Sequence, residues 1–173
     1  EKIAEQSHEP DLWYLFAPLK KARVDYMMQK ATELGVSVIS PVMTARTNLD
    51  KLKIEKLKAS AFEAAEQCGR MSVPSINDII SLDDMLKSWP EDRALIFCDE
   101  VGDAVPMKDL TSEFDKWAVI IGPEGGFTEE ERKKIKDHRN TLPVTLGPRI
   151  LRADTAAVTA ISLWQSFFGD WKQ

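Results

Sequence analysis

Two stretches of this sequence carry residues whose types and spacing suit ligand binding, IGPEGGFTEEE at 121–131 and LGPRILRADTAAVTA at 146–160. Each passes from an apolar run through Gly-Pro into a short loop and then into a helical pattern. Glycine and proline give such loops tight, preset backbone, and a helix start leaves N–H groups that can face a ligand. We therefore expect the two stretches, about 25 residues apart, to lie side by side and to form one ligand site.

The first stretch favours a neutral or cationic ligand. Gly122, Gly125 and Gly126 permit close approach of the backbone, but their spacing fits neither the P-loop nor the dinucleotide fingerprint. Glu124 lies inside the loop, where its charge would repel a phosphate unless a metal intervened. The alternative interpretation is a glycine-rich turn that binds no ligand.

The second stretch adds apolar and cationic side chains. Ile150 and Leu151 can wall an apolar slot for a flat ring, whereas Arg152 has no evident purpose in a plain connecting loop. Asp154 either serves the site or is simply the N-cap of the last helix. That helix carries two apolar stripes, Ala157, Ile161, Trp164 and Phe168 on one and Ala156, Ala160, Leu163 and Phe167 on the other. We expect one stripe to pack on the core and the other on a second subunit.

The composition is that of one folded domain with a sizeable core, since 43% of the 173 residues are hydrophobic and 29% are charged. No apolar run approaches the roughly 20 residues of a membrane span, and no signal peptide is visible. Cys68, Cys98, His8 and His138 lack the spacing of metal ligands. We therefore expect a cytoplasmic protein with reduced core thiols, no metal and no membrane partner.

The net charge of −5 argues against a chain that holds nucleic acid by its overall charge. Basic residues nevertheless cluster at 20–23, 51–58 and 132–136. Two interpretations of these clusters stay open, solvated helix faces or local contacts to nucleic acid.

Alternating strand and helix patterns surround the two stretches. Strands are expected at 12–17, 36–43, 73–76, 94–98, 117–121 and 142–146, and helices at 20–34, 51–69, 82–89, after Thr128 and at 155–168. Pro41 is expected near a sheet edge or a turn, and 99–110 is expected to be a loop. Thr128 and Glu131 have the spacing of a capping box. The alternation predicts an α/β layer with a mostly parallel sheet.

Four stretches closely resemble the RsmE family of ribosomal RNA small-subunit (uracil-N3)-methyltransferases, of the SPOUT superfamily. They are ELGVSVISPV at 33–42, EAAEQCGR at 63–70, IGPEGGFTEEE at 121–131 and LGPRILRADTAAVTAI at 146–161. The resemblance covers about residues 12–169, in the order and spacing of the family.

The resemblance implies a SPOUT-type domain at 12–173, with a mostly parallel sheet flanked by helices and a deep trefoil knot in its C-terminal portion. It also implies that residues 1–11 are the tail of an N-terminal PUA-like RNA-binding domain that is largely missing from this chain. The first residue, Glu1 rather than Met, is what we expect of such a fragment.

The resemblance further implies that S-adenosylmethionine binds in a cleft built from three loops. Carried over to this sequence, the cofactor-binding residues are Phe97, Asp99, Ile121, Gly122, Gly125, Gly126, Leu146, Gly147, Ile150 and Leu151. Leu146, Ile150 and Leu151 would enclose the adenine. The implied partners are 16S ribosomal RNA or the small ribosomal subunit, and a second copy of the chain, because the family forms homodimers with the cleft at the interface.

Methylation of uridine N3 requires the loss of a proton, which leaves negative charge shared with the two carbonyl oxygens. Arg152 is our candidate for a cation near those oxygens, since its planar fork suits uracil carbonyls. Glu124 is our candidate general base, and a wholly structural role is the alternative. Arg23 and Arg70 are candidate contacts to the RNA backbone.

Two other functions remain open at this point. One is a knotted methyltransferase that acts on a ribose 2′-hydroxyl of transfer or ribosomal RNA. The other is a ribosome-assembly factor that keeps the fold but not the reaction. The sequence does not determine the target nucleotide, or whether the substrate is naked RNA or an assembled subunit.

Overall fold

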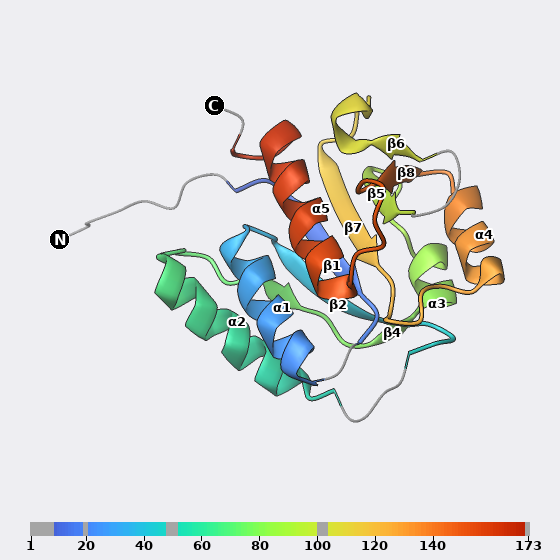
Figure 1. Ribbon diagram of the computed structural model, residues 1–173. Helices are drawn as coiled ribbons and strands as arrows, with labels where there is room; N and C mark the ends of the chain where they lie inside the picture. The colour runs from blue at the N-terminus through green and yellow to red at the C-terminus, as the bar shows by residue number, and fades with distance from the viewer. Residues whose placement is uncertain (1–8, 19–20, 48–51, 100–103, 172–173) are drawn as a thin grey trace.

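A single parallel sheet forms the middle layer of the protein, as the computed structural model shows for residues 9–18, 21–47, 52–99 and 104–171 (Figure 1). Its strands are β1 Leu12–Phe16, β2 Val38–Met43, β3 Ser75–Ile76, β4 Ile80–Ser81, β5 Arg93–Cys98, β6 Val105–Pro106, β7 Lys116–Ile121 and β8 Thr141–Thr145. The strand order is β3-β2-β1-β7-β5-β8-β6, with β4 also beside β2, and each of these pairings is parallel.

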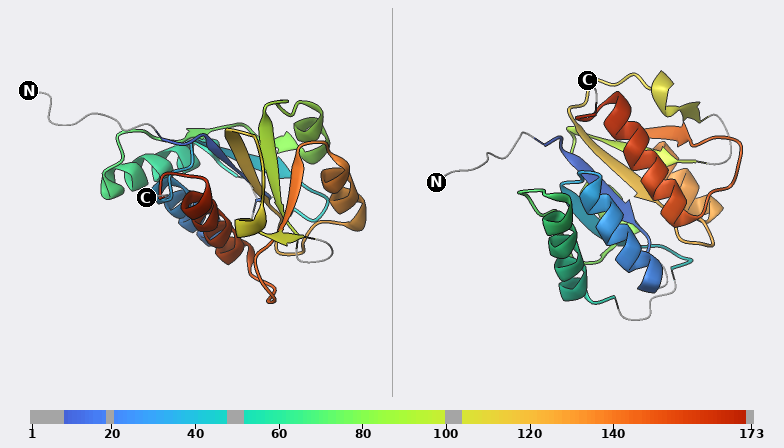
Figure 2. Two further views of the ribbon diagram at one scale, coloured as in Figure 1. Left: turned by 90° about the horizontal axis from the view of Figure 1, so that it is seen from above. Right: turned by 60° about the vertical axis from the view of Figure 1, so that its left-hand side comes forward.

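Helices cover both faces of the sheet (Figure 2). They are α1 Lys21–Glu33, α2 Ile54–Cys68, α3 Leu82–Lys87, α4 Glu129–Asp137 and α5 Ala153–Phe167, and a 3-10 turn, η1, spans Met107–Asp109. Helices α1, α2 and α5 lie on one face, and α3 and α4 lie on the other. This arrangement confirms the predicted α/β class with a mostly parallel sheet flanked by helices.

Apart from their first residues, Arg93 and Lys116, the central strands β5 and β7 are apolar because they are buried on both faces. Alternate residues of a strand point to opposite faces, so Ile96 of β5 joins the core under α1 and α5, while Leu95 and Phe97 join the core under α3 and α4. In β7, Val119 and Ile120 divide between the two cores in the same way. Two helix layers can therefore pack on the same five or six residues of strand.

Most predicted elements are confirmed, with boundaries shifted by a few residues. The interval 99–110, which we expected to be a loop, contains the short strand β6 and η1. Pro41 lies within β2 rather than at its end, between the residues that pair with β3 and those that pair with β4. A proline is tolerated at that gap because it has no N–H to offer a neighbouring strand.

The structure contradicts one of the two alternatives left open for Asp154, the N-cap, and the predicted core position of Cys68. Helix α5 begins at Ala153, so Asp154 lies in its first turn and Arg152 occupies the N-cap position without a side-chain capping bond. Cys68 is exposed rather than in the core, and its thiol is free. None of the helices in the described ranges is long and apolar enough to span a bilayer. The knot and the second subunit remain predictions.

Arg93 ties the segment that precedes β1 to the sheet. Its guanidinium lies 3.6 Å from the ring centroid of Trp13, and it donates to the Asp11 carboxylate at 2.6 Å and to the Trp117 carbonyl at 2.8 Å. Burial by itself would raise the pKa of Asp11, but the hydrogen bonds and charge of Arg93, helped by Ser37, outweigh it. The pKa of Asp11 therefore lies below its usual value of 3.8.

We predict that this pair makes stability sensitive to acid. A carboxylate whose pKa is lowered by folding stabilises the protein above its unfolded pKa, and this contribution is lost as the pH falls through the folded pKa. Urea unfolding at pH 5, 4 and 3 should show a smaller loss of unfolding free energy for Asp11→Asn than for the wild type. Equal losses in the two proteins would contradict this assignment.

Candidate active site

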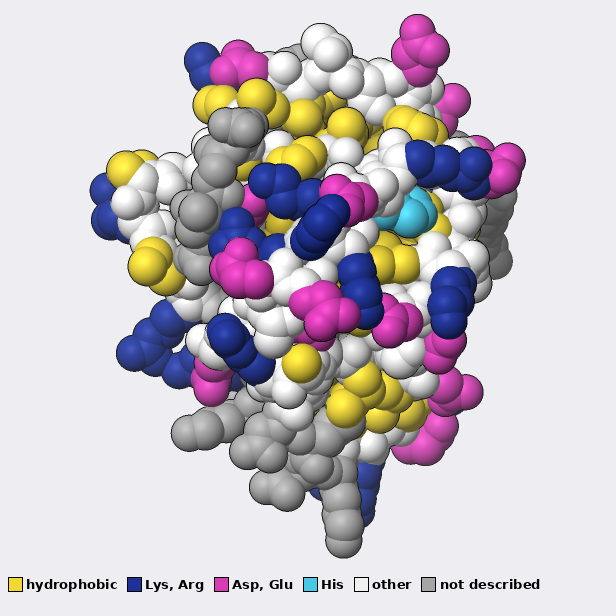
Figure 3. Space-filling view, turned by 90° about the vertical axis from the view of Figure 1, so that its right-hand side faces the viewer, with side chains coloured by type: hydrophobic (Ala, Val, Ile, Leu, Met, Phe, Trp, Pro, Cys, Tyr) yellow, Lys and Arg dark blue, Asp and Glu magenta, His cyan; other side chains and the backbone are white. Residues whose placement is uncertain are grey.

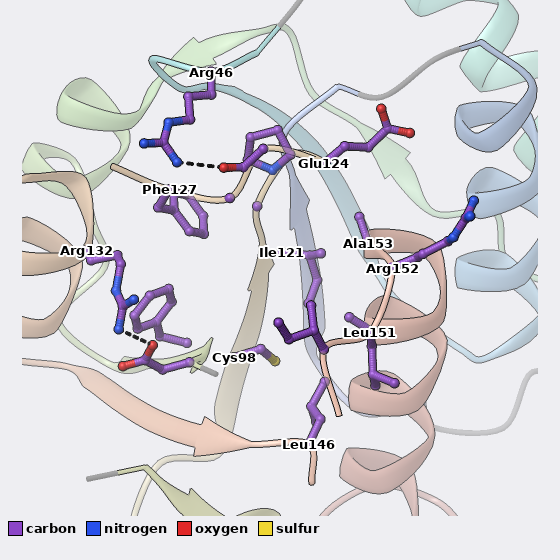
Figure 4. A pocket seen from close by; sticks show the side chains of 18 of the residues that line it. Arg46, Cys98, Ile121, Glu124, Phe127, Arg132, Leu146, Leu151, Arg152 and Ala153 are labelled. Carbon is purple, nitrogen blue, oxygen red and sulfur yellow. Dashed lines mark hydrogen bonds and ion pairs between the residues drawn. The ribbon is translucent and has the colours of Figure 1, made fainter. Parts of the chain in front are cut away.

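A pocket of about 660 Å³ opens at the carboxyl ends of β5, β7 and β8 (Figure 4). These strands are neighbours in the order β7-β5-β8, and because they are parallel their following loops emerge at one edge of the sheet. The lining residues are Arg23, Arg46, Phe97, Cys98, Asp99, Ile121, Gly122, Pro123, Glu124, Gly125, Gly126, Phe127, Glu129, Arg132, Leu146, Gly147, Arg149, Ile150, Leu151, Arg152, Ala153 and Ala156. The two stretches singled out in the sequence therefore do meet in one cavity.

The loop after β7 passes so close to Phe127 that position 122 has no room for a Cβ, whereas a Cβ at Gly125 would make an ordinary van der Waals contact. A Cβ on Gly122 would lie 2.8 Å from the Phe127 ring, and one on Gly125 would lie 3.4 Å from Cδ of Arg46. Phe127 in turn packs edge-on against Phe97, with ring centroids 5.6 Å apart. The glycines thus let the loop fold down between an aromatic pair and an arginine, which shapes one wall of the pocket.

Helix α4 fixes the end of this loop. Its N-cap Thr128 accepts a hydrogen bond from the Glu131 N–H, and the Glu131 carboxylate accepts one from the Thr128 N–H, as the predicted capping box requires. One turn further on, Arg132 pairs at 2.6 Å with Asp99, which directly follows β5. Lys136 lies 3.3 Å from the other oxygen of Asp99. The two loops are therefore joined by buried charge, since the Asp99 side chain is only 2% exposed.

The loop after β8 forms the opposite, more open wall. Leu146 and Leu151 are half-buried, and both point into the cavity (Figure 4). Ile150 lines the same pocket but is 84% exposed, so within one chain it lies at the rim, and its contact with the adenine stays a prediction. Arg149 and Arg152 are exposed as well.

Glu124, the candidate base, has a specific partner. Its carboxylate lies 2.6 Å from the guanidinium of Arg23 near the start of α1. Both side chains are partly exposed at the pocket edge, 40% for Glu124 and 27% for Arg23. Glu124 and Arg152 extend toward the same side of the pocket, where α1 lies (Figure 4). The structure thus brings three of the predicted functional side chains to one rim.

Arg70 is placed elsewhere, and our expectation of an RNA contact is not supported for it. Its side chain is 10% exposed and donates to both oxygens of Glu9, to the carbonyls of Thr32 and Val36, and to Ser72. With its donors engaged in this way, the guanidinium holds the end of α2 to the start of the described chain.

The basic cluster at 132–136 is neutralised by carboxylates. Lys133 pairs with Asp137, and Lys134 pairs with Asp83 and Glu130. Figure 3 shows this face, with basic and acidic side chains interleaved. For Lys133 and Lys134 the solvated-face interpretation is the better one, whereas Arg132 and Lys136 pair with the buried Asp99. Residues 20 and 51 of the other two clusters lie outside the described residues.

Several residues of the pocket were missed in the sequence. Arg46 follows β2, 79 residues before Gly125, the residue of the glycine loop that it contacts, and no motif marks it. Arg132 was counted only as part of a basic cluster, although its position directly after the capping box, one turn after Thr128, could have indicated it. Phe127 was missed because the glycines directly before it were taken as the functional part of that stretch.

Cys98 lines the pocket as a neutral thiol, because burial raises its pKa to about 12. A nucleophilic cysteine needs the opposite shift, toward the thiolate. In the described part of the chain, no group of three or more His, Cys, Asp and Glu residues is placed to hold a metal ion.

The family model for an RNA methyltransferase domain matches residues 6–165 of this sequence. The chain belongs to the RNA methyltransferase family. A relative in this family, the ribosomal RNA small subunit methyltransferase E of Rickettsia conorii, is 30% identical over 93% of this chain and 68% of its own length. The enzyme of the same name from Buchnera aphidicola is 34% identical over 88% of this chain. That enzyme is longer, and the match covers 62% of its length.

A solved structure of the same family has the same fold. The crystal structure of ribosomal RNA small subunit methyltransferase E from Neisseria gonorrhoeae, bound to S-adenosyl methionine, has a TM-score of 0.87 and 30% identity to this chain. The match covers 97% of this chain and 72% of that one. The predicted family is thereby confirmed.

We predict that the ion pair between Asp99 and Arg132 is a major contributor to the stability of the pocket. Arg132→Met removes a partner from a buried carboxylate and should lower the free energy of unfolding by about 3 kcal/mol. The double variant that also carries Asp99→Asn should lose less unfolding free energy than the two single variants together. In the double variant neither partner leaves an unpaired charge behind. Urea unfolding of the four proteins measures this, and strictly additive losses would refute it.

Proposed function

We propose that this protein transfers a methyl group from S-adenosylmethionine to N3 of a uridine in 16S ribosomal RNA. One observation carries the proposal: all ten residues expected to bind the cofactor line one pocket, together with Arg152 and Glu124. The matched relatives are named as small-subunit ribosomal RNA methyltransferases, and the related structure from Neisseria gonorrhoeae holds S-adenosyl methionine.

The pocket fits such a cofactor in size and in chemistry. Its volume of about 660 Å³ lies within the range of small-molecule sites. Leu146 and Leu151 offer an apolar wall for a planar base, and the glycine loop brings backbone amides and carbonyls close to the cavity. Glu124 adds a partly exposed carboxylate at the edge of the pocket.

Bound S-adenosylmethionine supplies a methyl carbon that is activated by its positively charged sulfur. The work of the protein is then to orient the uracil ring, to exclude water and to move the N3 proton. The rim formed by Arg23, Glu124 and Arg152 has the groups for the last task, because it offers both a carboxylate and two cations. We assign the rim to the uracil and the interior to the cofactor.

Arg152 stabilises the negative charge that spreads onto the uracil carbonyl oxygens when N3 loses its proton. It is exposed at the N-cap of α5, so it can reach a base that enters from solvent. Glu124 accepts the proton. Arg23, which we first assigned to the RNA backbone, orients the Glu124 carboxylate through their ion pair.

The proposal extends to the assembly of the protein and to the domain that precedes the methyltransferase domain. We propose that it acts as a homodimer in the cytoplasm, where its ribosomal substrate is found, and that exposed Ile150 and one face of α5 meet the second subunit. The C-terminal portion would form the trefoil knot, and a PUA-like domain preceding residue 12 would supply much of the RNA grip. The net charge of −5 supports that division, because this chain lacks a strongly basic balance of its own.

Incubation with S-adenosylmethionine and small ribosomal subunits that lack the modification tests the reaction, with the methylated nucleotide located by mass mapping. A methyl group on uracil N3 is expected. A ribose methyl would replace the N3 assignment by 2′-hydroxyl methylation. Failure to bind S-adenosylmethionine at millimolar concentration in a calorimetric titration would point to a non-catalytic assembly factor.

We predict that Arg152→Ala lowers kcat by about 100-fold, as the loss of a donor to a developing oxyanion does. The affinity for S-adenosylmethionine should change much less, because the charge acts on the uracil. Steady-state methylation kinetics separate the two quantities. The control is Arg139→Ala, an exposed arginine that does not line the pocket. Full turnover of the Arg152 variant would remove it from the reaction.

We predict that Glu124→Gln also lowers kcat by about 100-fold, since an amide cannot accept the N3 proton. Glu63→Gln, at an exposed position on α2, is the matched control. A kcat equal to that of the wild type would leave Glu124 a structural role only.

A further inference from the structure

The turn at residues 44–47, directly after β2, is docked onto the candidate active site. It is closed on itself, because the Thr47 N–H donates to the Thr44 carbonyl at 3.1 Å and the two threonine hydroxyls lie 2.7 Å apart. Arg46 extends from this turn and donates from Nη1 to the Gly125 carbonyl at 2.7 Å (Figure 4). The turn at 44–47, which is distant in sequence, thus holds the glycine loop through Arg46.

Glu131 binds the same turn from the other side. Its Oε2 accepts the Thr128 N–H at 2.9 Å, which completes the capping box of α4. Its Oε1 accepts the Ala45 N–H at 2.6 Å, which the capping box does not require. Glu131 is 9% exposed, and each of its oxygens is engaged by an amide from a separate segment.

Together these contacts connect Glu131 to the glycine loop in three steps. Glu131 anchors Ala45, the closed turn carries Arg46, and Arg46 holds Gly125. The last contact is also a close packing contact, since a Cβ on Gly125 would lie 3.4 Å from Cδ of Arg46. Gly125 belongs to the loop that lines the pocket, so a shift of the turn is transmitted to the wall of the pocket.

We propose that Glu131 is a positioning residue, which sets the shape of the cofactor loop through the turn at 44–47 and Arg46. The inference rests on the proposed function for the identity of the ligand. A carboxylate is needed at this place because it accepts two N–H groups, whereas an amide would turn its own NH₂ toward one of them. Helix capping alone does not explain the bond to Ala45.

A double-mutant cycle on the affinity for S-adenosylmethionine tests the proposal, with calorimetry on the full chain. Glu131→Gln and Arg46→Ala are each expected to weaken binding by about ten-fold. Because they break the same chain of contacts, the double variant should be weakened by little more than either single variant. A product of the two effects, about 100-fold, would show that Glu131 and Arg46 act independently and would overturn the proposal.

Two controls separate positioning from general effects on α4. Glu130→Gln changes the same charge in the same turn, at a side chain that is 80% exposed. It should leave the affinity unchanged. Thr128→Ala removes the capping hydroxyl but not the acceptor of the Ala45 N–H. It should lower the melting temperature, and its effect on affinity should multiply with that of Arg46→Ala. If Glu131→Gln behaves like Thr128→Ala, Glu131 is a helix cap and no more.

Amide hydrogen exchange gives a second measurement that needs no ligand. The Ala45 N–H should exchange faster in Glu131→Gln than in Glu130→Gln, and equal rates would overturn the proposal. If Glu131→Gln does not fold, Glu131→Asp keeps the charge but is too short to reach both amides, and the same cycle applies to it. A wild-type chain that fails to bind S-adenosylmethionine would overturn the proposed function. If the wild-type chain binds S-adenosylmethionine and the two variants weaken that binding independently, only the positioning role of Glu131 is overturned.

Discussion

The parallel pairing of β7, β5 and β8 is the constraint on which the site depends. Because all three strands run the same way, the loops that follow them emerge at one edge, although they are separated by tens of residues in sequence. The same pairing buries both faces of β5 and β7, which is why these two strands are apolar after their first residues, Arg93 and Lys116. The chemistry is therefore left to the loops.

Those loops are held in place by a small number of charged contacts. Arg132 and Asp99 join the loop after β5 to α4, and Arg23 with Glu124 joins the glycine loop to α1. Five arginines and three carboxylates line the pocket of a chain whose net charge is −5. Positive charge is thus gathered where a nucleic acid would approach and is offset elsewhere, as on the interleaved face of α4 (Figure 3).

Arg70, a candidate RNA contact in the sequence, instead stabilises the fold. Arg70 gives its guanidinium to Glu9 and to backbone carbonyls, and Arg93 does the same with Asp11 and the Trp117 carbonyl. A buried arginine and a substrate-binding arginine are alike in sequence, since both are isolated cations beside apolar runs. The difference lies in which partners the tertiary fold brings within hydrogen-bonding distance.

The sequence by itself determined the class of fold, most of the elements, the capping box at Thr128 and the two glycine-proline junctions, because each depends on residues close together in the chain. The resemblance added the set of ten cofactor residues, which the structure gathers in one pocket. Only the tertiary structure decided that Arg46 contacts Gly125, that Arg23 pairs with Glu124, and that Glu131 also binds Ala45. These contacts join segments between 79 and 101 residues apart, so no local pattern could predict them.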